Sequence, residues 1–251
     1  MAFSVVIPAR YAATRLPGKP LLDICGKPML QHTYERALAS DAEAVIVATD
    51  DERIKQVAEG FGAKVCMTSA EHRSGTDRIQ EVASQLGMTE QQILVNVQAD
   101  EPLIPPTVIN QVAENLNNNH EVGISTLCEI ITSQAEIDDP NSVKVVMDKR
   151  GHALYFSRCS IPYHSNASAK NCYRHIGIYG YRVATLNQFI QWPPAELEMQ
   201  EKLEQLRALY NGVAIHVEVS SEAIPPGVDT ERDLELVRAH LSESELPGKS
   251  G

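Results

Sequence analysis

Residues 3–20 have the sequence FSVVIPARYAATRLPGKP, a short apolar run followed directly by a loop that carries three cations. The run Phe3–Ile7 is rich in residues that favour strands. The cations are Arg10, Arg15 and Lys19, and they lie so close together in the sequence that they would repel one another without an anion between them. A basic loop at this position is typical of a phosphate site, because parallel sheets bind ligands at the carboxyl ends of their strands.

The chemistry of the loop favours phosphate binding over a plain solvated basic loop, which is the alternative interpretation. Arginine forks fit phosphate oxygens, and lysine suits the concentrated charge of a triphosphate. The loop is neither a Walker A motif nor a dinucleotide fingerprint, because Pro20 follows Gly18 and Lys19 and the glycine spacings are wrong.

Strand and helix patterns alternate through the first half of the chain. The expected strands span 3–7, 45–48, 64–67 and 93–97, and the expected helices span 28–40, 51–59, 76–86 and 107–116. This alternation predicts an α/β fold, a mostly parallel sheet flanked by helices. The continuous apolar strands fit a sheet that is covered on both faces.

The pattern changes near residue 120. Further strands are expected at 123–131, 143–147, 153–156, 176–181 and 215–219, and helices at 197–210 and 230–241. We therefore predict a single domain over residues 1–241. It would carry a smaller β-rich lobe at about 122–182, for dimerisation or substrate binding, and a flexible tail over 242–251.

Composition excludes several classes of protein. The 251 residues carry a formal net charge of -11, which argues against a nucleic-acid-binding face. The five cysteines are scattered, which favours reduced thiols over a disulfide frame or a zinc site. The first apolar run is too short for a signal peptide, and no apolar window is long enough to span a bilayer. We expect a cytoplasmic protein.

Two acidic residues are candidates for a metal site. Asp100 follows the expected strand 93–97, and Mg²⁺ prefers one or two carboxylates together with phosphate oxygens. Taken alone, Asp100 is equally explained as a turn residue before Pro102. Asp229 is, taken alone, better explained as the N-cap of the last helix.

Seven segments occur in the order typical of one family, the sugar-acid cytidylyltransferases, and most resemble the 3-deoxy-manno-octulosonate (Kdo) cytidylyltransferases, or CMP-Kdo synthetases. They are IPARYAATRLPGKPL (7–21), HRSGTDR (72–78), VNVQADEP (95–102), ALYFSR (153–158), RHIGIYGYR (174–182), EKLEQLRAL (201–209) and GVDT (227–230). The resemblance covers roughly residues 3–241. The chain departs from the family at Ala99, where glycine is common, and in a shorter segment over 162–173.

The resemblance implies a fold of the nucleotide-diphospho-sugar transferase type, a homodimer, and Mg²⁺-dependent transfer of CMP from CTP to the anomeric hydroxyl of Kdo, for lipopolysaccharide biosynthesis. It assigns catalysis to Arg10, Arg15, Lys19 and Asp100, and the metal to Asp100 and Asp229. It places the nucleotide at Ala9, Arg10, Arg15, Lys19, Arg73, Ser74, Gly75 and Arg78. It places the sugar acid at Gln98, Arg158, His175, Tyr179, Glu204 and Gln205.

Two alternatives remain beside this reaction. One is the same transfer to another sugar acid, such as a sialic acid or an amino analogue of Kdo. The other is a nucleotide-sensing module without catalysis, against which the retained cations and carboxylates argue. A nicotinamide dehydrogenase is disfavoured because the glycine fingerprint is missing. No nucleic-acid or membrane partner is expected.

Overall fold

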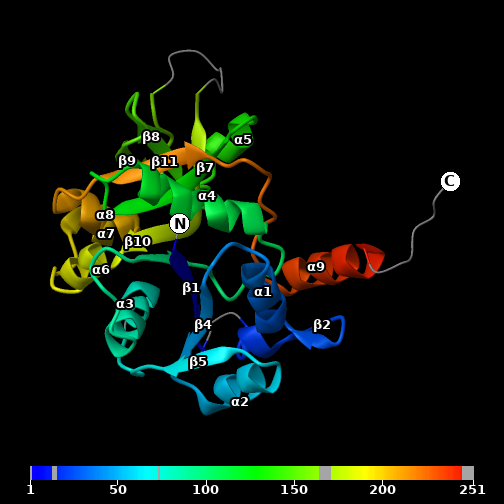
Figure 1. Ribbon diagram of the computed structural model, residues 1–251. Helices are drawn as coiled ribbons and strands as arrows, with labels where there is room; N and C mark the ends of the chain where they lie inside the picture. Colours follow the sequence, from blue (N-terminus) through cyan, green and yellow to red (C-terminus); the bar gives the residue numbers. More distant parts are fainter. Residues whose placement is uncertain (1, 13–15, 73, 164–170, 245–251) are drawn as a thin grey trace.

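A nine-stranded sheet forms the centre of the computed structural model, which describes residues 2–12, 16–72, 74–163 and 171–244 (Figure 1). The continuous path through the sheet has the order β11 (Ile215–Val219), β7 (Ile124–Ile130), β10 (Tyr173–Arg182), β6 (Ile93–Asn96), β1 (Phe3–Ala9), β4 (Ala44–Thr49) and β5 (Lys64–Met67). Two more strands, β8 (Lys144–Met147) and β9 (Ala153–Ser157), lie off this path.

The N-terminal half of the sheet is parallel. Strand β1 pairs in parallel with β4 on one side and with β6 on the other, and β4 pairs in parallel with β5. The chain therefore builds outward from β1 to β5 and then returns to the other side of β1. This confirms the α/β class and the parallel arrangement predicted from the alternating patterns.

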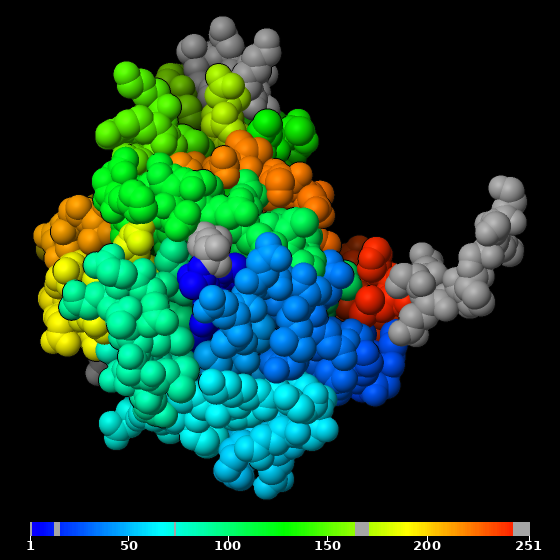
Figure 2. Space-filling model, in the orientation of Figure 1, coloured from blue at the N-terminus to red at the C-terminus, as the bar shows by residue number. Residues whose placement is uncertain are grey.

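The second half of the chain extends the same sheet with mixed pairing. Strand β10 lies antiparallel between β6 and β7, and β11 pairs in parallel with β7. Strands β8 and β9 form an antiparallel ribbon that joins the N-terminal end of β10. In the space-filling view the green-to-orange segments pack directly on the blue and cyan half (Figure 2). The expected β-rich region at about 122–182 thus contributes β7 and β10 to the main sheet, and its description as a lobe stays a prediction.

Helices cover both faces of the sheet. One face packs against α1 (Met29–Leu38), α2 (Glu52–Gly60) and α4 (Pro106–Asn118). The other face packs against α3 (Gly75–Gln85), α6 (Val183–Phe189) and α8 (Gln205–Tyr210). Successive side chains of a strand point to opposite faces, so Val5 and Ile7 enter the first core and Val6 enters the second. Two layers of helices explain why the strands are apolar along their whole length.

The C-terminal helix α9 (Glu231–Ser244) packs on the β2–β3 hairpin (Asp23–Ile24 and Lys27–Pro28) rather than on the main sheet (Figure 1). The contact buries Ile24 and Met29 against Leu234 and Val237. The short helix η1 (Lys19–Leu21) precedes this hairpin. The helix continues to Ser244, whereas the tail was expected to begin at residue 242. The apolar contacts of Leu241 with the same cluster support the added turn.

The single helix expected over 197–210 is wrong, because two short helices occupy this segment. They are α7 (Glu196–Glu201) and α8, and between them Lys202 adopts a left-handed conformation with a φ of 55°. The amide of Leu203 donates to the carbonyl of Glu198, which closes the end of α7. The guanidinium of Arg158 donates to the carbonyl of Glu201. These tertiary contacts stabilise a break that helical periodicity does not reveal.

Helices α5 (Gln134–Asp138) and α6 were not predicted from the sequence. Both are shorter than the average helix, and short helices have few turns in which a period can be recognised. No disulfide joins any of the five cysteines, all of which lie in the described residues. Within that part of the chain, no helix is long and apolar enough to cross a membrane.

Gly180 in β10 provides a test of the packing between sheet and helix. A Cβ at this position would lie 2.7 Å from Oγ of Ser125 and 2.9 Å from Cγ1 of Val112. We expect Gly180→Ala to lower the free energy of unfolding by about 1–3 kcal/mol, because the buried Ser125 and α4 must move apart. Urea denaturation measures the change.

Gly177→Ala is the matched control, since it lies in the same strand and a Cβ there meets no atom within 4 Å. We expect its free energy of unfolding to stay within about 0.5 kcal/mol of the wild-type value. Equal effects of the two substitutions would contradict the packing described here.

Candidate functional site

A cavity of about 300 Å³ opens at the carboxyl ends of β1 and β6. This is the point where the strand order reverses, with β4 on one side of β1 and β6 on the other, and open α/β sheets bind ligands there. The residues that line it are Pro8, Arg10, Lys19, Pro20, Ser74, Gly75, Gln98, Ala99 and Asp100. The structure therefore brings together, from four separate segments, most of the described residues that were predicted to bind the nucleotide.

The Lys19 ammonium lies between two carboxylates. Its Nζ is 2.5 Å from Oδ2 of Asp100 and 2.9 Å from Oδ1 of Asp229. Burial alone would lower the pKa of Lys19, but hydrogen bonds and charges from Asp100 and then Asp229 outweigh it and raise that pKa. The two predicted metal ligands thus converge on one point that stabilises positive charge.

Backbone contacts fix Asp229 beside Asp100. The amide of Val228 donates to the carbonyl of Asp100 over 2.8 Å. A Cβ on Gly227 would lie 3.2 Å from the same carbonyl oxygen, so glycine permits the close approach. Thr230, rather than Asp229, caps α9, because its Oγ1 accepts from the amide of Asp233. The carboxylate of Asp229 is therefore not used as a helix cap and is available to pair with Lys19.

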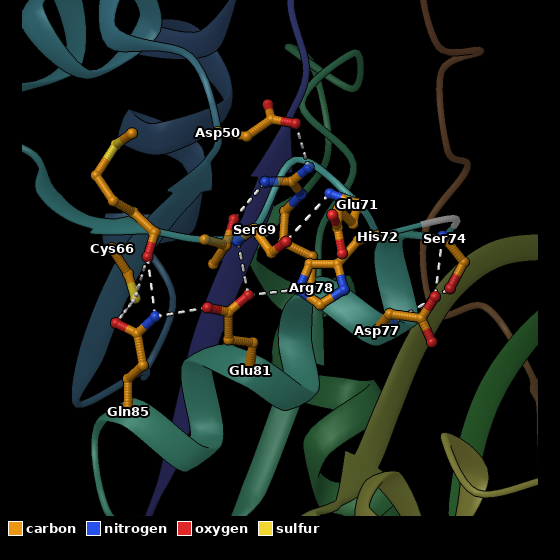
Figure 3. A network of polar contacts seen from close by, with 12 residues as sticks. Asp50, Cys66, Ser69, Glu71, His72, Ser74, Asp77, Arg78, Glu81 and Gln85 are labelled. Atoms are coloured by element: carbon orange, nitrogen blue, oxygen red, sulfur yellow. Dashed lines mark hydrogen bonds and ion pairs between the residues drawn. The ribbon is translucent and has the colours of Figure 1, made fainter.

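Arg10 ties the loop before α3 to the end of β1. Its Nη2 donates to the carbonyls of His72 and Ser74, each over 2.9 Å. Ser74 caps α3 in a reciprocal capping box with Asp77, and His72 hydrogen-bonds Glu81 on the next turn of the helix (Figure 3). Burial, and then the nearby charge of Arg78, lowers the pKa of Arg10. The N-terminus of α3 is consequently held rigid at the rim of the cavity.

Arg78, a predicted nucleotide residue, lies behind this loop rather than in the cavity. Its side chain is fully buried and donates to Asp50 over 2.9 Å and to Thr68 (Figure 3). Of the three other residues predicted to bind the nucleotide, the structure describes one. Ala9 is buried at the end of β1, and Arg15 and Arg73 lie outside the described residues.

The predicted sugar-acid residues lie in several places. Gln98 lines the main cavity. His175 and Tyr179 belong to an aromatic series along β10, with ring centroids 5.3 Å apart. Nε2 of His175 is hydrogen-bonded to Oγ1 of Thr126 over 3.0 Å, and the same hydroxyl lies within hydrogen-bond distance of the carbonyls of Ile176 and Ile178. Burial lowers the pKa of His175 to about 3, and the ring is therefore neutral.

Tyr179, Glu204 and Gln205 meet in a small cavity of about 70 Å³, together with Tyr181. Burial raises the pKa of Tyr179 and of Tyr181. The Nε2 atom of Gln205 is buried without a hydrogen-bond partner. An orphaned amide among hydroxyls and a carboxylate is what a site for a polar ligand requires.

Arg158 is engaged elsewhere in this conformation. Its guanidinium donates to the carbonyls of Glu201, Pro140 and Lys202. Its own amide is held by the carboxylate of Glu201. Arg158 thus connects the β8–β9 ribbon by hydrogen bonds to the break between α7 and α8. It does not line the main cavity.

Glu101 is a residue that the sequence reasoning missed. Its Oε2 atom is buried without a hydrogen-bond partner. The residue lines another cavity, of about 160 Å³, with Arg174 and His175. Burial, and then the charge of Asp100, raises the pKa of Glu101 to about 8. Its position directly after Asp100 was the available signal. Thr76 belongs to the predicted nucleotide segment 72–78, but its contact with Glu204 was not predicted.

The carboxylates of Asp100 and Asp229 form the donor pair that could hold a metal. In the part of the chain that the structure describes, no three His, Cys, Asp or Glu side chains gather into a ligand cluster. A hard cation at this pair would therefore take its other ligands from water or from a bound phosphate, as Mg²⁺ prefers. Cations and carboxylates gathered at one cavity suit the transfer of a phosphoryl group.

Comparison with known proteins agrees with this chemistry. Residues 4–217 match the family model described as cytidylyltransferase. The chain is 58% identical over 251 residues to a 3-deoxy-manno-octulosonate cytidylyltransferase of Cellvibrio japonicus, with 96% of this chain and 98% of the relative covered. It is 55% identical over 249 residues to one of Alcanivorax borkumensis, with 96% and 99% covered. It superposes with a TM-score of 0.90 and 46% identity on CMP:2-keto-3-deoxy-manno-octonic acid synthetase complexed with CTP, covering 97% and 99% of the two chains.

The low pKa of His175 predicts acid sensitivity. The unfolded chain binds a proton near the ordinary pKa of histidine, and the folded chain does so only near 3. The unfolded state therefore binds more protons at every pH between these values, and the free energy of unfolding falls as the pH is lowered through this window. We expect this residue to contribute a loss of about 1 kcal/mol between about pH 7.5 and 5.5.

Urea denaturation at both pH values tests this contribution. His175→Gln is expected to lose about 1 kcal/mol less than the wild type over this range. His120→Gln, at an exposed position, serves as the control and is expected to behave as the wild type. The same loss in wild type and His175→Gln would refute the assignment.

Proposed function

The chain belongs to the cytidylyltransferase family, among relatives named 3-deoxy-manno-octulosonate cytidylyltransferases, and on this premise we propose that it transfers CMP from CTP to the anomeric hydroxyl of Kdo. The products are CMP-Kdo and pyrophosphate. The observation that carries the proposal is the cavity lined by Arg10, Lys19 and Asp100, in which Lys19 is also ion-paired with Asp229. Similarity along almost the whole chain to a synthetase complexed with CTP supports it.

The transfer is a single in-line displacement. The anomeric oxygen forms a bond to the α-phosphorus, the bond from that phosphorus to the bridging oxygen breaks, and pyrophosphate leaves with the electron pair. The hydroxyl gives up its proton to water. No covalent intermediate on the protein is needed, because positioning and charge neutralisation supply most of the catalysis in such reactions.

Arg10 and Lys19 supply positive charge to the triphosphate. Both line the cavity beside the N-terminus of α3, where Ser74 and Gly75 present the first turn of the helix. A helix N-terminus and a guanidinium favour the same anionic group. Arg15 belongs to the same loop and is assigned the same role from the family resemblance.

We propose Mg²⁺ as the cofactor, held by Asp100 and Asp229. The residues fit this ion, because both ligands are carboxylate oxygens and the Lys19 ammonium already marks a cationic point between them. When bound, Mg²⁺ supplies positive charge that stabilises the reacting phosphate. With the ion bound, Asp100 and Asp229 would be its ligands, and the Lys19 ammonium would contribute its charge to the phosphates.

The acceptor is assigned to the residues that surround the small cavity and its rim. Gln98, Tyr179, Glu204 and Gln205 offer amides, a hydroxyl and a carboxylate for the sugar hydroxyls. His175 packs on Tyr179 within the same strand, β10. Arg158 would hold the carboxylate of the sugar acid only after it leaves the carbonyls that it contacts in this structure.

Pyrophosphate release tests the function. With CTP, Kdo and Mg²⁺ present together we expect release, and omission of any one of the three is expected to abolish it. Asp100→Asn removes one of the two metal carboxylates and is expected to lower kcat by about 100-fold or more. Sialic acid and UTP are the parallel substrates for specificity.

Asp41→Asn is the matched control, since Asp41 is an exposed carboxylate that accepts a hydrogen bond from Asn110 away from the cavity. It is expected to retain the wild-type kcat. Release that proceeds without Kdo, or that requires sialic acid in its place, would overturn the proposed acceptor. Undiminished activity of Asp100→Asn would overturn the metal site.

We further propose from the family resemblance that the protein is a cytoplasmic homodimer that supplies CMP-Kdo to lipopolysaccharide biosynthesis. The second half of the sheet offers a surface for the dimer. Leu154 in β9 and Ile130 at the end of β7 are 64% and 58% exposed. Apolar side chains of this size on one region of a sheet favour contact with another protein surface.

Sedimentation equilibrium tests the dimer. The wild type is expected to have twice the mass of one chain, and Leu154→Lys is expected to shift the equilibrium toward the monomer because it places a charge in the interface. Leu236→Lys on α9, at a position that is similarly exposed, is the control and should remain dimeric. A wild type with the mass of a single chain would contradict the proposal.

A further inference from the structure

A hydrogen bond connects the nucleotide loop to the predicted acceptor residues. Thr76 lies in the first turn of α3, and its Oγ1 donates to Oε2 of Glu204 over 2.5 Å. The hydroxyl of Tyr181 hydrogen-bonds the same threonine side chain. Glu204 lies 128 residues further along the chain than Thr76 and directly precedes α8. The contact therefore joins two elements that the sequence places far apart.

The two ends of this bond belong to different subsites. Thr76 directly follows Ser74 and Gly75, which line the cavity of about 300 Å³ at β1 and β6. Glu204 lines the cavity of about 70 Å³ together with Tyr179 and Gln205. A displacement of the first turn of α3 is thus transmitted through one hydroxyl to a carboxylate of the other cavity.

Two features strengthen the hydrogen bond between Thr76 and Glu204. Thr76 is only 3% exposed, so water does not compete for its hydroxyl. A hydrogen bond to an ionised carboxylate is stronger than one between neutral groups. In the part of the chain that the structure describes, Arg207 forms an ion pair with Glu204, with Nη2 3.9 Å from Oε1, but Arg207 is paired more closely with Glu198 over 2.5 Å. The position of Oε2 of Glu204 therefore depends mainly on Thr76.

We propose that Thr76 is a positioning residue that couples the two subsites of the transfer reaction. Its hydroxyl orients the Glu204 carboxylate, so that a nucleotide held at Ser74 and Gly75 favours the arrangement of Glu204 that receives the sugar acid. The inference rests on the proposed function. By linkage the effect is reciprocal, and the sugar acid strengthens nucleotide binding by the same factor.

Thr76→Val and Thr76→Ser test the coupling. Valine keeps the shape of threonine without the hydroxyl, whereas serine keeps the hydroxyl. Calorimetry with a CTP analogue that has a methylene between the α and β phosphorus atoms gives the affinity for nucleotide with and without Kdo. Steady-state pyrophosphate release gives kcat and the KM for Kdo.

For Thr76→Val we expect the KM for Kdo to rise by about 10-fold, while the affinity for the analogue alone changes by less than about twofold. The factor by which Kdo strengthens binding of the analogue is expected to fall toward one. Thr76→Ser is expected to restore both values. In a Glu204→Ala background, Thr76→Val is expected to add less than about twofold to the KM, because its partner is already absent.

Thr185→Val is the matched control, because it also removes a largely buried threonine hydroxyl, in α6. It is expected to leave the KM for Kdo unchanged. Three results would overturn the inference: a wild-type KM for Thr76→Val, failure of serine to restore the coupling, or an equal loss of affinity for the analogue alone. A wild type that releases no pyrophosphate with Kdo contradicts instead the proposed function, so the two failures are distinguishable.

Discussion

The ion triad of Lys19, Asp100 and Asp229 is the interaction on which the site depends. It joins three segments: the segment after β1, the loop after β6, and the segment before α9. Two carboxylates that converge in this way repel each other unless a cation lies between them. The geometry of the cavity therefore requires positive charge at this point, from lysine or from a metal ion.

The backbone around the triad is built to hold the carboxylates in place. The amide of Val228 donates to the carbonyl of Asp100, and Gly227 allows the two chains to approach closely. Thr230 and Asp233 complete the cap of α9, so the cap does not consume Asp229. The packing of α9 on the β2–β3 hairpin thus helps to set the position of Asp229, which is far from the hairpin in sequence.

At the rim of the cavity, the side chains of Arg10 and Arg78 fix the N-terminus of α3. Arg10 holds the carbonyls of the loop, and Arg78 is neutralised by Asp50 beneath it. A motif that contains both a loop arginine and a helix arginine does not reveal which one faces solvent. Burial separates them here: Arg10 lines the cavity, and Arg78 supports the helix that lines it.

The sequence by itself determined the α/β class and the alternation of strands and helices in the first half of the chain. It also located the basic segment after β1 and the acidic residues after β6. These features can be read from the sequence because the hydrophobic period and the position of a loop are local properties. Family resemblance added the sugar-acid residues. Only the tertiary structure decided the break at Lys202, the engagement of Arg158 with carbonyls, and the bond from Thr76 to Glu204. Each of these joins residues that are distant along the chain or depends on a partner from another element, and local patterns carry no record of such partners.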